Sequence, residues 1–270
     1  MTGASSTGRP STAAAFLAGV LRAGAFAAAG CSVAAGAGAV CSAAAFCLLA
    51  DCAFPQLAFQ AGGFESAHHG EGRWNGVAIL SRRGLDDVRF GFADDGEPDA
   101  EARLMTATCD GLRIVNVYVP NGRALDADHY QYKLRWLDRL ARHLDLVAAD
   151  GVPVVVAGDF NIAPADVDVY DPEAFVGETH VSEPEREQLR RLEAWGLVDL
   201  FRRLHPDAER VFSWWDYRRG DFHEGRGMRI DLVLAAPALV DRAQFCVIDR
   251  NARKGKAPSD HAPVIVDLAD

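Results

Sequence analysis

The chain has 270 residues, of which 49% are hydrophobic and 24% are charged, and its formal net charge is −10. This composition is that of an ordinary globular protein large enough for one large domain, and the acidic balance argues against a general nucleic-acid coat protein. The six cysteines have neither the paired spacing of a zinc site nor the density of a disulfide scaffold, so we expect reduced thiols in a cytoplasmic protein.

Residues 1–52 differ in composition from the rest of the chain. From Ala13 to Ala50 the sequence is mostly Ala, Gly, Ser and Cys, and Arg22 is its only charged residue. Four explanations are open: a signal peptide, a membrane span over residues 23–50, a low-complexity tail, and a segment read out of its native frame. Because Ala and Gly are weakly hydrophobic, insertion of such a span would be marginal. We therefore divide the chain into this atypical segment and one folded domain, residues 53–270.

From Phe54 onward, the predicted elements are those of an α/β protein. Short apolar or β-rich runs predict strands over residues 77–80, 104–109, 112–119, 154–156, 230–234 and 263–266. Asp110-Gly111 between two of these runs predicts a hairpin. Apolar residues at helical spacing predict an amphipathic helix over residues 130–149, and a second helix is predicted over residues 185–195. Many strands with few helices favour packed sheets flanked by helices.

The predicted strand between Pro153 and Gly158 ends on an acid and an amide, Asp159 and Asn161. These two side chains share one face, because side chains alternate along an extended chain. In α/β folds, strand ends of this kind meet in the crevice where ligands bind. A carboxylate beside a carboxamide suits cation coordination, proton transfer or contact with a phosphate oxygen. The alternative is a strand that simply ends in a turn.

Three further polar groups lie at or near strand ends. Tyr118 is expected at the end of one strand, where an ordinary half-buried tyrosine is the alternative. Asp231 lies in an otherwise apolar strand, and a buried acid costs several kcal/mol unless it is paired. His261 precedes the last strand and is a candidate partner, since a carboxylate that bonds an imidazole orients it and raises its basicity.

Residues 212–219, Phe-Ser-Trp-Trp-Asp-Tyr-Arg-Arg, combine aromatic and basic side chains. Exposed aromatic rings between arginines supply stacking planes and phosphate contacts for a nucleic acid. The charged residues of this stretch argue against deep burial. We therefore expect an exposed, polyanion-binding surface here.

Taken in order, these segments resemble the exodeoxyribonuclease III family, the bacterial abasic-site endonucleases of the endonuclease/exonuclease/phosphatase superfamily. The matching segments are residues 74–78, 116–121, 158–161, 213–218, 229–231 and 259–261. Gly-Asp-Phe-Asn and Ser-Asp-His occur across the superfamily, whereas the tryptophan-arginine stretch that leads into Arg-Ile-Asp is specific to its DNA-repair branch. The resemblance covers about four-fifths of the chain, from Phe54 to the end.

The resemblance implies a fold, an activity and a partner. The fold is a four-layer α/β sandwich, in which two packed mixed sheets are flanked by helices. The activity is hydrolysis of DNA phosphodiesters, as a 3′–5′ exonuclease and an abasic-site endonuclease. The cofactor is magnesium (Mg²⁺), with manganese (Mn²⁺) as the alternative. The partner is double-stranded DNA with abasic or 3′-end sites, bound by a monomer in the bacterial cytoplasm.

The resemblance also implies catalytic roles by position. His261, held by Asp231, would assist the attack on phosphorus. Asp159 would activate the attacking water or protonate the leaving group. Tyr118 and Asn161 would hold the phosphate and its developing charge, as donors placed in advance do.

Further positions would bind the metal and the DNA. The metal ligands carried over are Asp260, Asp159 and Asn161. Trp214 and its neighbours would line a pocket for an extruded abasic sugar, since extrusion costs least where a base is missing. The DNA contacts carried over are Asn121, Trp214, Trp215, Arg218 and Arg226.

Two motifs of the family are absent from this chain. The family begins with a strand carrying Trp-Asn-x-Asn and a second strand ending in Leu-Gln-Glu, whose glutamate is a main magnesium ligand. Counting back from Phe54 places the glutamate position near Phe46 and the asparagine position near Gly19. A phenylalanine cannot coordinate a cation. We therefore expect the chain to lack two groups of the metal site and the first strands of one sheet.

A shifted reading frame would explain a segment of native length and foreign composition, and a paralogue that lost its metal site is the alternative. In both cases we predict strongly impaired activity. Two other functions are weighed: a DNA-binding pseudoenzyme, tethered or not through residues 23–50, and a phosphodiesterase acting on a phospholipid or sugar phosphate. The tryptophan-arginine stretch argues against the second.

Overall fold

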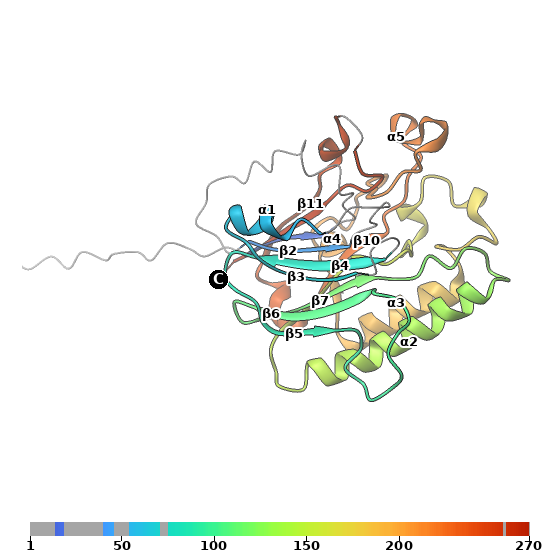
Figure 1. The fold of residues 1–270 in the computed structure, drawn as a ribbon. Coiled ribbons are helices and arrows are strands. Elements are labelled where there is room, and N and C mark those ends of the chain that lie inside the picture. The colour runs from blue at the N-terminus through green and yellow to red at the C-terminus, as the bar shows by residue number, and fades with distance from the viewer. Residues whose placement is uncertain (1–13, 19–39, 46–53, 71–74, 256–257, 270) are drawn as a thin grey trace, which may run out of the picture.

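In the computed structural model, the described residues are 14–18, 40–45, 54–70, 75–255 and 258–269 (Figure 1). Their strands form two six-stranded sheets. The first sheet has the order β11 (Ala243–Ile248), β12 (Val264–Leu268), β1 (Ala14–Ala18), β2 (Val40–Ala45), β4 (Gly76–Ser81) and β3 (Glu65–Gly70). The second sheet has the order β5 (Asp86–Phe90), β6 (Leu104–Cys109), β7 (Leu112–Tyr118), β8 (Val154–Asp159), β10 (Asp231–Ala235) and β9 (Val198–Asp199).

Helices connect the strands and cover the sheets. The α-helices are α1 (Gln56–Ala61), α2 (Asp128–Val147), α3 (Glu183–Trp195), α4 (Leu200–Leu204), α5 (Asp221–Glu224) and α6 (Pro237–Val240). The short 3₁₀ helices are η1 (Asp166–Asp168), η2 (Glu173–Phe175), η3 (Arg218–Gly220) and η4 (Arg250–Arg253).

Buried side chains form separate layers on the two faces of each sheet. In β4, Val77 and Ile79 face a core between the sheets, whereas Ala78 and Leu80 face outward and pack with Phe59 of α1. This alternation follows from the period of two along a strand. Apolar residues of α2 and α3 cover the outer face of the second sheet, and Figure 1 shows these two helices running together below β6 and β7. The predicted four-layer α/β sandwich is confirmed.

The predicted hairpin and both predicted helices are present. Asp110 and Gly111 join β6 to β7 with φ values of 50° and 78°, the left-handed conformation that a tight two-residue hairpin turn requires. The helix expected over residues 130–149 is α2, which begins at Asp128 and ends at Val147. The second expected helix is α3, whose Ser182 and Glu185 form a capping box at its start.

The first sheet contains two strands from the atypical N-terminal segment. β1 pairs in parallel with β2 and antiparallel with β12, so both strands lie in the middle of the sheet. The expectation that the chain lacks the first strands of one sheet is therefore wrong. Strand pairing joins backbone N–H and C=O groups, which an Ala-rich segment supplies as well as any other.

Most of the N-terminal segment lies outside the described residues. Of the span expected over residues 23–50, the described part is the strand β2. In the part of the chain that the structure describes, no helix is both long and apolar enough to cross a membrane. Gly19 and Phe46, near which the two absent motifs would lie, are also outside the described residues.

Strand ends that carry polar residues meet at one edge of the second sheet. Tyr118 ends β7 and is the parallel partner of Asp159, which ends β8. Asp231 begins β10 and pairs with Asp159 from the other side. The alternation of parallel and antiparallel pairs thus places three predicted site residues side by side.

Candidate active site

Asp159 is held at the end of β8 by the turn that follows it. Its Oδ1 accepts a 2.8 Å hydrogen bond from the backbone N–H of Asn161, and its Oδ2 accepts one of 2.9 Å from Asn161 Nδ2. Burial raises the pKa of Asp159 to about 7, and the adjacent His261 opposes this rise. A carboxyl group with such a pKa can both accept and release a proton near neutral pH.

Asp231 and His261 form a buried pair beside Asp159. Nδ1 of His261 lies 2.8 Å from Oδ2 of Asp231. Although burial would lower it, the pKa of His261 is raised to about 9 by the Asp231 carboxylate. The acid predicted within an apolar strand therefore has the partner that its burial requires. Because Nδ1 bonds the carboxylate, Nε2 is the ring nitrogen left to act on a substrate.

Ser213 joins the two chain segments that carry this pair. Its buried Oγ accepts hydrogen bonds of 3.0 Å from the backbone N–H groups of Ile230 and Asp231. Its carbonyl oxygen accepts one of 2.6 Å from the N–H of Ala262. One buried serine therefore fixes the start of β10 against the segment that holds the histidine.

Two asparagines and a histidine meet next to Asp159. Nδ2 of the exposed Asn121 donates a 3.2 Å hydrogen bond to Oδ1 of Asn161. Nε2 of His180 lies 3.0 Å from Asn121 Nδ2 and 3.2 Å from Asn161 Oδ1. Besides its bond to Asp159, Nδ2 of Asn161 donates to Val119 O over 3.0 Å. Both amide hydrogens of Asn161 thus bind protein acceptors, and the amide of Asn121 is the more accessible one.

Tyr118 lies half-buried at the same edge of the sheet. The guanidinium of Arg103 stacks over its ring, 4.7 Å from the centroid, and Nη1 of Arg103 donates a 3.1 Å hydrogen bond to Tyr118 O. Glu101 in turn pairs with Arg103. The stacked guanidinium and the packing of Tyr118 against the core between the sheets restrict the orientation of its ring.

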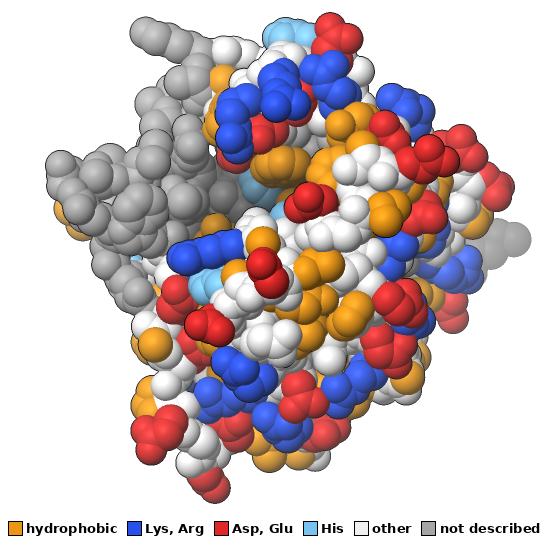
Figure 2. Space-filling model, turned by 90° about the vertical axis from the view of Figure 1, so that its right-hand side faces the viewer, with side chains coloured by type: hydrophobic (Ala, Val, Ile, Leu, Met, Phe, Trp, Pro, Cys, Tyr) orange, Lys and Arg blue, Asp and Glu red, His pale blue; other side chains and the backbone are white. Residues whose placement is uncertain are grey.

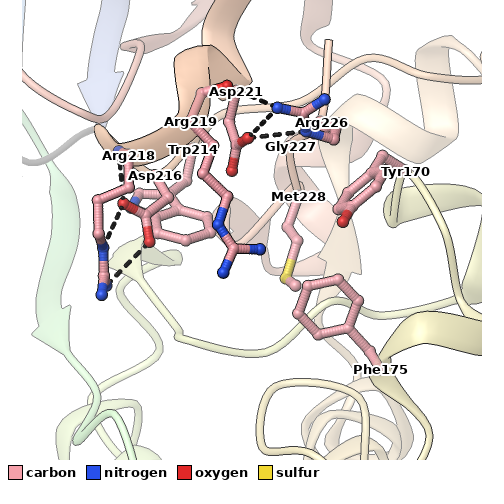
Figure 3. A pocket seen from close by; sticks show the side chains of 10 residues that line it. All are labelled: Tyr170, Phe175, Trp214, Asp216, Arg218, Arg219, Asp221, Arg226, Gly227 and Met228. Carbon is pink, nitrogen blue, oxygen red and sulfur yellow. Dashed lines mark hydrogen bonds and ion pairs between the residues drawn. The ribbon is translucent and has the colours of Figure 1, made fainter. Parts of the chain in front are cut away.

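The tryptophan-arginine stretch borders a cavity of about 280 Å³. Its lining residues are Tyr170, Phe175, Trp214, Asp216, Arg218, Arg219, Asp221, Arg226, Gly227 and Met228. Arg218 pairs with Asp216 and Arg226 pairs with Asp221. Figure 3 shows the guanidinium of Arg219 pointing between the ring of Trp214 and Met228. In the space-filling view, basic side chains gather at the top of this face, above a hollow where histidine side chains are visible (Figure 2).

The expectation that Trp215 is an exposed DNA contact is wrong. Trp215 is 1% exposed, because its ring packs into the core between the sheets, against Phe212 and Phe222. Arg253 stacks over the same ring, 5.4 Å from its centroid. The first half of this stretch is therefore part of the core or its boundary, and the exposed residues are those from Tyr217 onward.

The described residues do not complete a metal site. No three or more of their His, Cys, Asp and Glu side chains are grouped so as to hold a metal ion. Of the three predicted metal ligands, Asp159 and Asn161 are bonded to each other, and Asp260 Oδ2 accepts a 3.4 Å hydrogen bond from Trp214 Nε1. Hard cations require several oxygen ligands, so this donor set is too small on its own.

The structure brings most of the predicted site residues together. At the sheet edge and its adjoining turns lie Tyr118, Asn121, Asp159, Asn161, Asp231 and His261. Trp214, Arg218 and Arg226 line the adjacent cavity. Sequence reasoning missed His180 and the buried residues Lys133 and Glu185, which contact the same turns. The capping box Ser182–Glu185 was the one available signal, and it indicates a helix start rather than a site.

Comparisons of the sequence with known proteins give one family model and several relatives. The family model of the Endonuclease/Exonuclease/phosphatase family matches residues 20–261. Exodeoxyribonuclease III of Haemophilus influenzae is 33% identical over 227 residues, which cover 80% of this chain and 85% of that protein. The exodeoxyribonuclease of Bacillus subtilis is 30% identical over 191 residues, which cover 71% of this chain and 73% of that protein.

Two solved structures are similar to almost the whole chain. The 3′ phosphatase NExo from Neisseria, solved with a product DNA hairpin, is 32% identical with a TM-score of 0.86, covering 94% of this chain and 98% of its own. An AP endonuclease from Archaeoglobus fulgidus is 31% identical with a TM-score of 0.84, covering 95% of this chain and 99% of its own.

Proposed function

Because the chain belongs to the endonuclease/exonuclease/phosphatase family, we propose that it is a DNA-repair nuclease of the exodeoxyribonuclease III type. Its substrates are DNA phosphodiesters at 3′ ends and at abasic sites in duplex DNA. The observation that carries this proposal is the Asp231–His261 pair beside the buried Asp159, next to a cavity lined by Trp214. In such a site, the protonated His261 is a cationic proton donor and Asp159 is a proton acceptor, and both could act on one phosphate.

In this proposal, two titratable groups, His261 and Asp159, have separate roles in the reaction. His261, with its raised pKa, is protonated at neutral pH, so its Nε2 can neutralise charge that develops on the phosphate. Asp159, with a pKa near 7, activates the attacking water or protonates the leaving oxygen. Tyr118 and Asn121 supply donors to the phosphate oxygens.

The cavity beside Trp214 would receive the extruded abasic sugar, since an aromatic wall and a pocket of this size suit an unstacked nucleotide. Arg219, which has no ion-pair partner among the described residues, would contact the DNA backbone there, and Arg218 and Arg226, each paired with an aspartate, would add weaker contacts. We further propose that the nuclease is a cytoplasmic monomer whose site residues all lie within residues 53–270, while β1 and β2 of the N-terminal segment complete its first sheet.

We also propose that catalysis by this chain is strongly impaired. Enzymes of this type generally depend on a divalent metal ion, with magnesium as the expected ion and manganese as the alternative. The described donor set does not complete a cation site, and the sequence has neither Trp-Asn-x-Asn nor Leu-Gln-Glu. The same observation favours a second candidate function, a DNA-binding pseudoenzyme.

Substrate class is tested by comparing hydrolysis and binding across phosphoesters. We expect the chain to bind duplex DNA with one abasic site in preference to intact duplex, and to release product from 3′ ends faster than from a sugar phosphate or phospholipid. Binding to DNA should weaken steeply with salt, because phosphate contacts release counterions. Faster hydrolysis of the sugar phosphate or phospholipid, with no preference for abasic DNA, would contradict the proposal.

A further inference from the structure

A lysine buried inside an amphipathic helix lies directly behind the two asparagines of the site. Lys133 of α2 is 0% exposed. Its Nζ donates a 2.7 Å hydrogen bond to the carbonyl oxygen of Asn161 and one of 3.2 Å to the carbonyl oxygen of Asn121. A single ammonium group thus joins the turn after β7 to the turn after β8.

The third bond of Lys133 goes to Glu185 of α3, which is also 0% exposed. Oε1 of Glu185 additionally accepts a 2.8 Å bond from Thr179 Oγ1 and a 3.0 Å bond from the N–H of His180. Oε2 of Glu185 accepts hydrogen bonds from the N–H and the Oγ of Ser182, which caps the start of α3. The ion pair is therefore surrounded by donors and acceptors that satisfy both charges, which a buried pair requires.

The network leads to the side chain of Asp159. Asn161, whose carbonyl Lys133 binds, donates to both carboxylate oxygens of Asp159 through its N–H and its amide. His180, whose N–H Glu185 binds, lies within hydrogen-bond distance of both asparagine amides. The side chains of Asn121 and Asn161 bond each other directly, but among the described residues no side chain other than Lys133 bonds both backbone carbonyls. A shift of the ammonium would therefore change the spacing of the two turns at their backbone.

We propose that Lys133 is a positioning residue that sets the distance between the Asn121 and Asn161 turns, and thereby the orientation of Asp159 and of the phosphate-binding amides. This inference rests on the proposed function for the ligand, a DNA phosphate, but its geometry concerns the free protein. Glu185 has a different part: it neutralises the lysine and fixes the start of α3. Loss of Glu185 should lower the stability of the fold. Loss of the lysine nitrogen should also change the orientation of Asp159 and of the asparagine amides.

The test compares two variants that differ only at this nitrogen, Glu185→Gln and Lys133→Met/Glu185→Gln. In Glu185→Gln the lysine keeps at least two N–H donors, which are enough for both carbonyls. The double variant removes these donors without leaving an unpaired buried charge. Leu144→Ala, on the buried face of α2, serves as a control for reduced stability alone.

Two readouts are used, both without metal. The first is the side-chain amide NMR resonances of Asn121 and Asn161, and the second is affinity for an abasic duplex in EDTA. We expect the Glu185→Gln and Leu144→Ala variants to retain both signals and to bind within about threefold of the unmodified protein. We expect the double variant to shift both amide signals and to bind about tenfold more weakly, as misplaced contacts do.

The inference would be overturned if Glu185→Gln and Lys133→Met/Glu185→Gln gave the same amide signals and the same affinity. If the double variant does not fold, Lys133→Gln in the same background gives the second comparison, with weakened rather than absent donors and an intermediate effect expected. If the unmodified protein does not prefer abasic DNA, the proposed function fails, while the amide signals still decide the role of Lys133.

Discussion

Gly158 shows how one residue without a side chain allows two strands to meet at the site. It precedes Asp159 and has a φ of 143°, which side-chain-bearing residues rarely adopt. A Cβ atom at this position would lie 2.0 Å from the carbonyl oxygen of Val117 in β7. The close contact of β7 and β8, which sets Tyr118 beside Asp159, therefore depends on glycine.

We expect Gly158→Ala to lower the free energy of unfolding by about 3 kcal/mol or more, because backbone strain and overpacking act together. Gly151→Ala is the matched control, since Gly151 also has a positive φ, of 78°, but nothing within 4 Å of an added Cβ. That control should cost about 1 kcal/mol. Urea unfolding measures both, and equal losses would show that the close approach to Val117 is unimportant.

Arg219 differs from the other arginines of its cavity in having no carboxylate partner. Within the described residues it forms no ion pair, whereas Arg218 and Arg226 each do. It also has a φ of 60°, in the left-handed region, which directs its side chain toward Trp214. A guanidinium without a partner beside an aromatic ring is well placed to bind a phosphate.

We expect Arg219→Ala to weaken binding to abasic duplex more than Arg218→Ala does. The slope of log K against log salt should fall by about one for each DNA phosphate that the variant no longer neutralises. Fluorescence anisotropy at several salt concentrations measures both quantities. A larger effect of Arg218→Ala would contradict the assignment, because the carboxylate of Asp216 already occupies that guanidinium.

At the scale of elements, the sequence predicts well the strands that are buried along their length and the helices that have one buried face. The hairpin at Asp110-Gly111 and the helix α2 follow from turn chemistry and apolar spacing. After Phe54, the strands β3, β5, β9 and β11 were missed. All four lie at the edge of a sheet, where a strand has a neighbour on one side only and little apolar pattern; β5 is exposed throughout.

The residues of the site also fall into those that the sequence predicts and those that it does not. Asp159, Asp231 and His261 were predicted because polar residues at strand ends are unusual. Lys133 was missed because a lysine within an amphipathic helix is expected to face water, and only the packing of α2 on α3 shows that it does not. Trp215 was misassigned because its neighbours are charged, while the face of an extended segment is set by tertiary packing.

The packing of α2 on β6 includes a buried histidine that makes stability depend on pH. Nδ1 of His143 accepts a 2.9 Å hydrogen bond from the N–H of Ala93, and its Nε2 lies 3.0 Å from Thr106 Oγ1. Burial lowers the pKa of His143 from 6.5 to about 4. The unfolded chain therefore binds a proton at a higher pH than the folded chain.

It follows that the contribution of neutral His143 is complete above pH 6.5 and disappears as the pH falls to about 4. The loss amounts to about 3 kcal/mol over this interval. Urea unfolding of the unmodified protein and of His143→Asn should give stabilities that converge as the pH falls through this range. A difference that stays constant with pH would show that His143 does not titrate in this way.

At the scale of the whole molecule, both sheets are formed, but the described residues do not supply enough ligands for a metal ion. The fold, which includes β1 and β2, is similar to solved structures of 31–32% identity, with TM-scores of 0.84 and 0.86. The Asp231–His261 pair and Asp159 are in place. The motifs Trp-Asn-x-Asn and Leu-Gln-Glu, which the resemblance leads one to expect in the first strands, are absent from the sequence. We therefore predict that the protein recognises damaged DNA but cleaves it poorly.

The most direct test is incision of a duplex carrying one abasic site, with and without magnesium, with Asp159→Ala as the control and the Haemophilus influenzae exodeoxyribonuclease III alongside. We predict that the chain binds the duplex but incises it about 100-fold or more slowly than that relative, and that Asp159→Ala removes what incision remains. Magnesium-dependent incision within about tenfold of the relative would contradict the account, because the remaining ligands would then be sufficient.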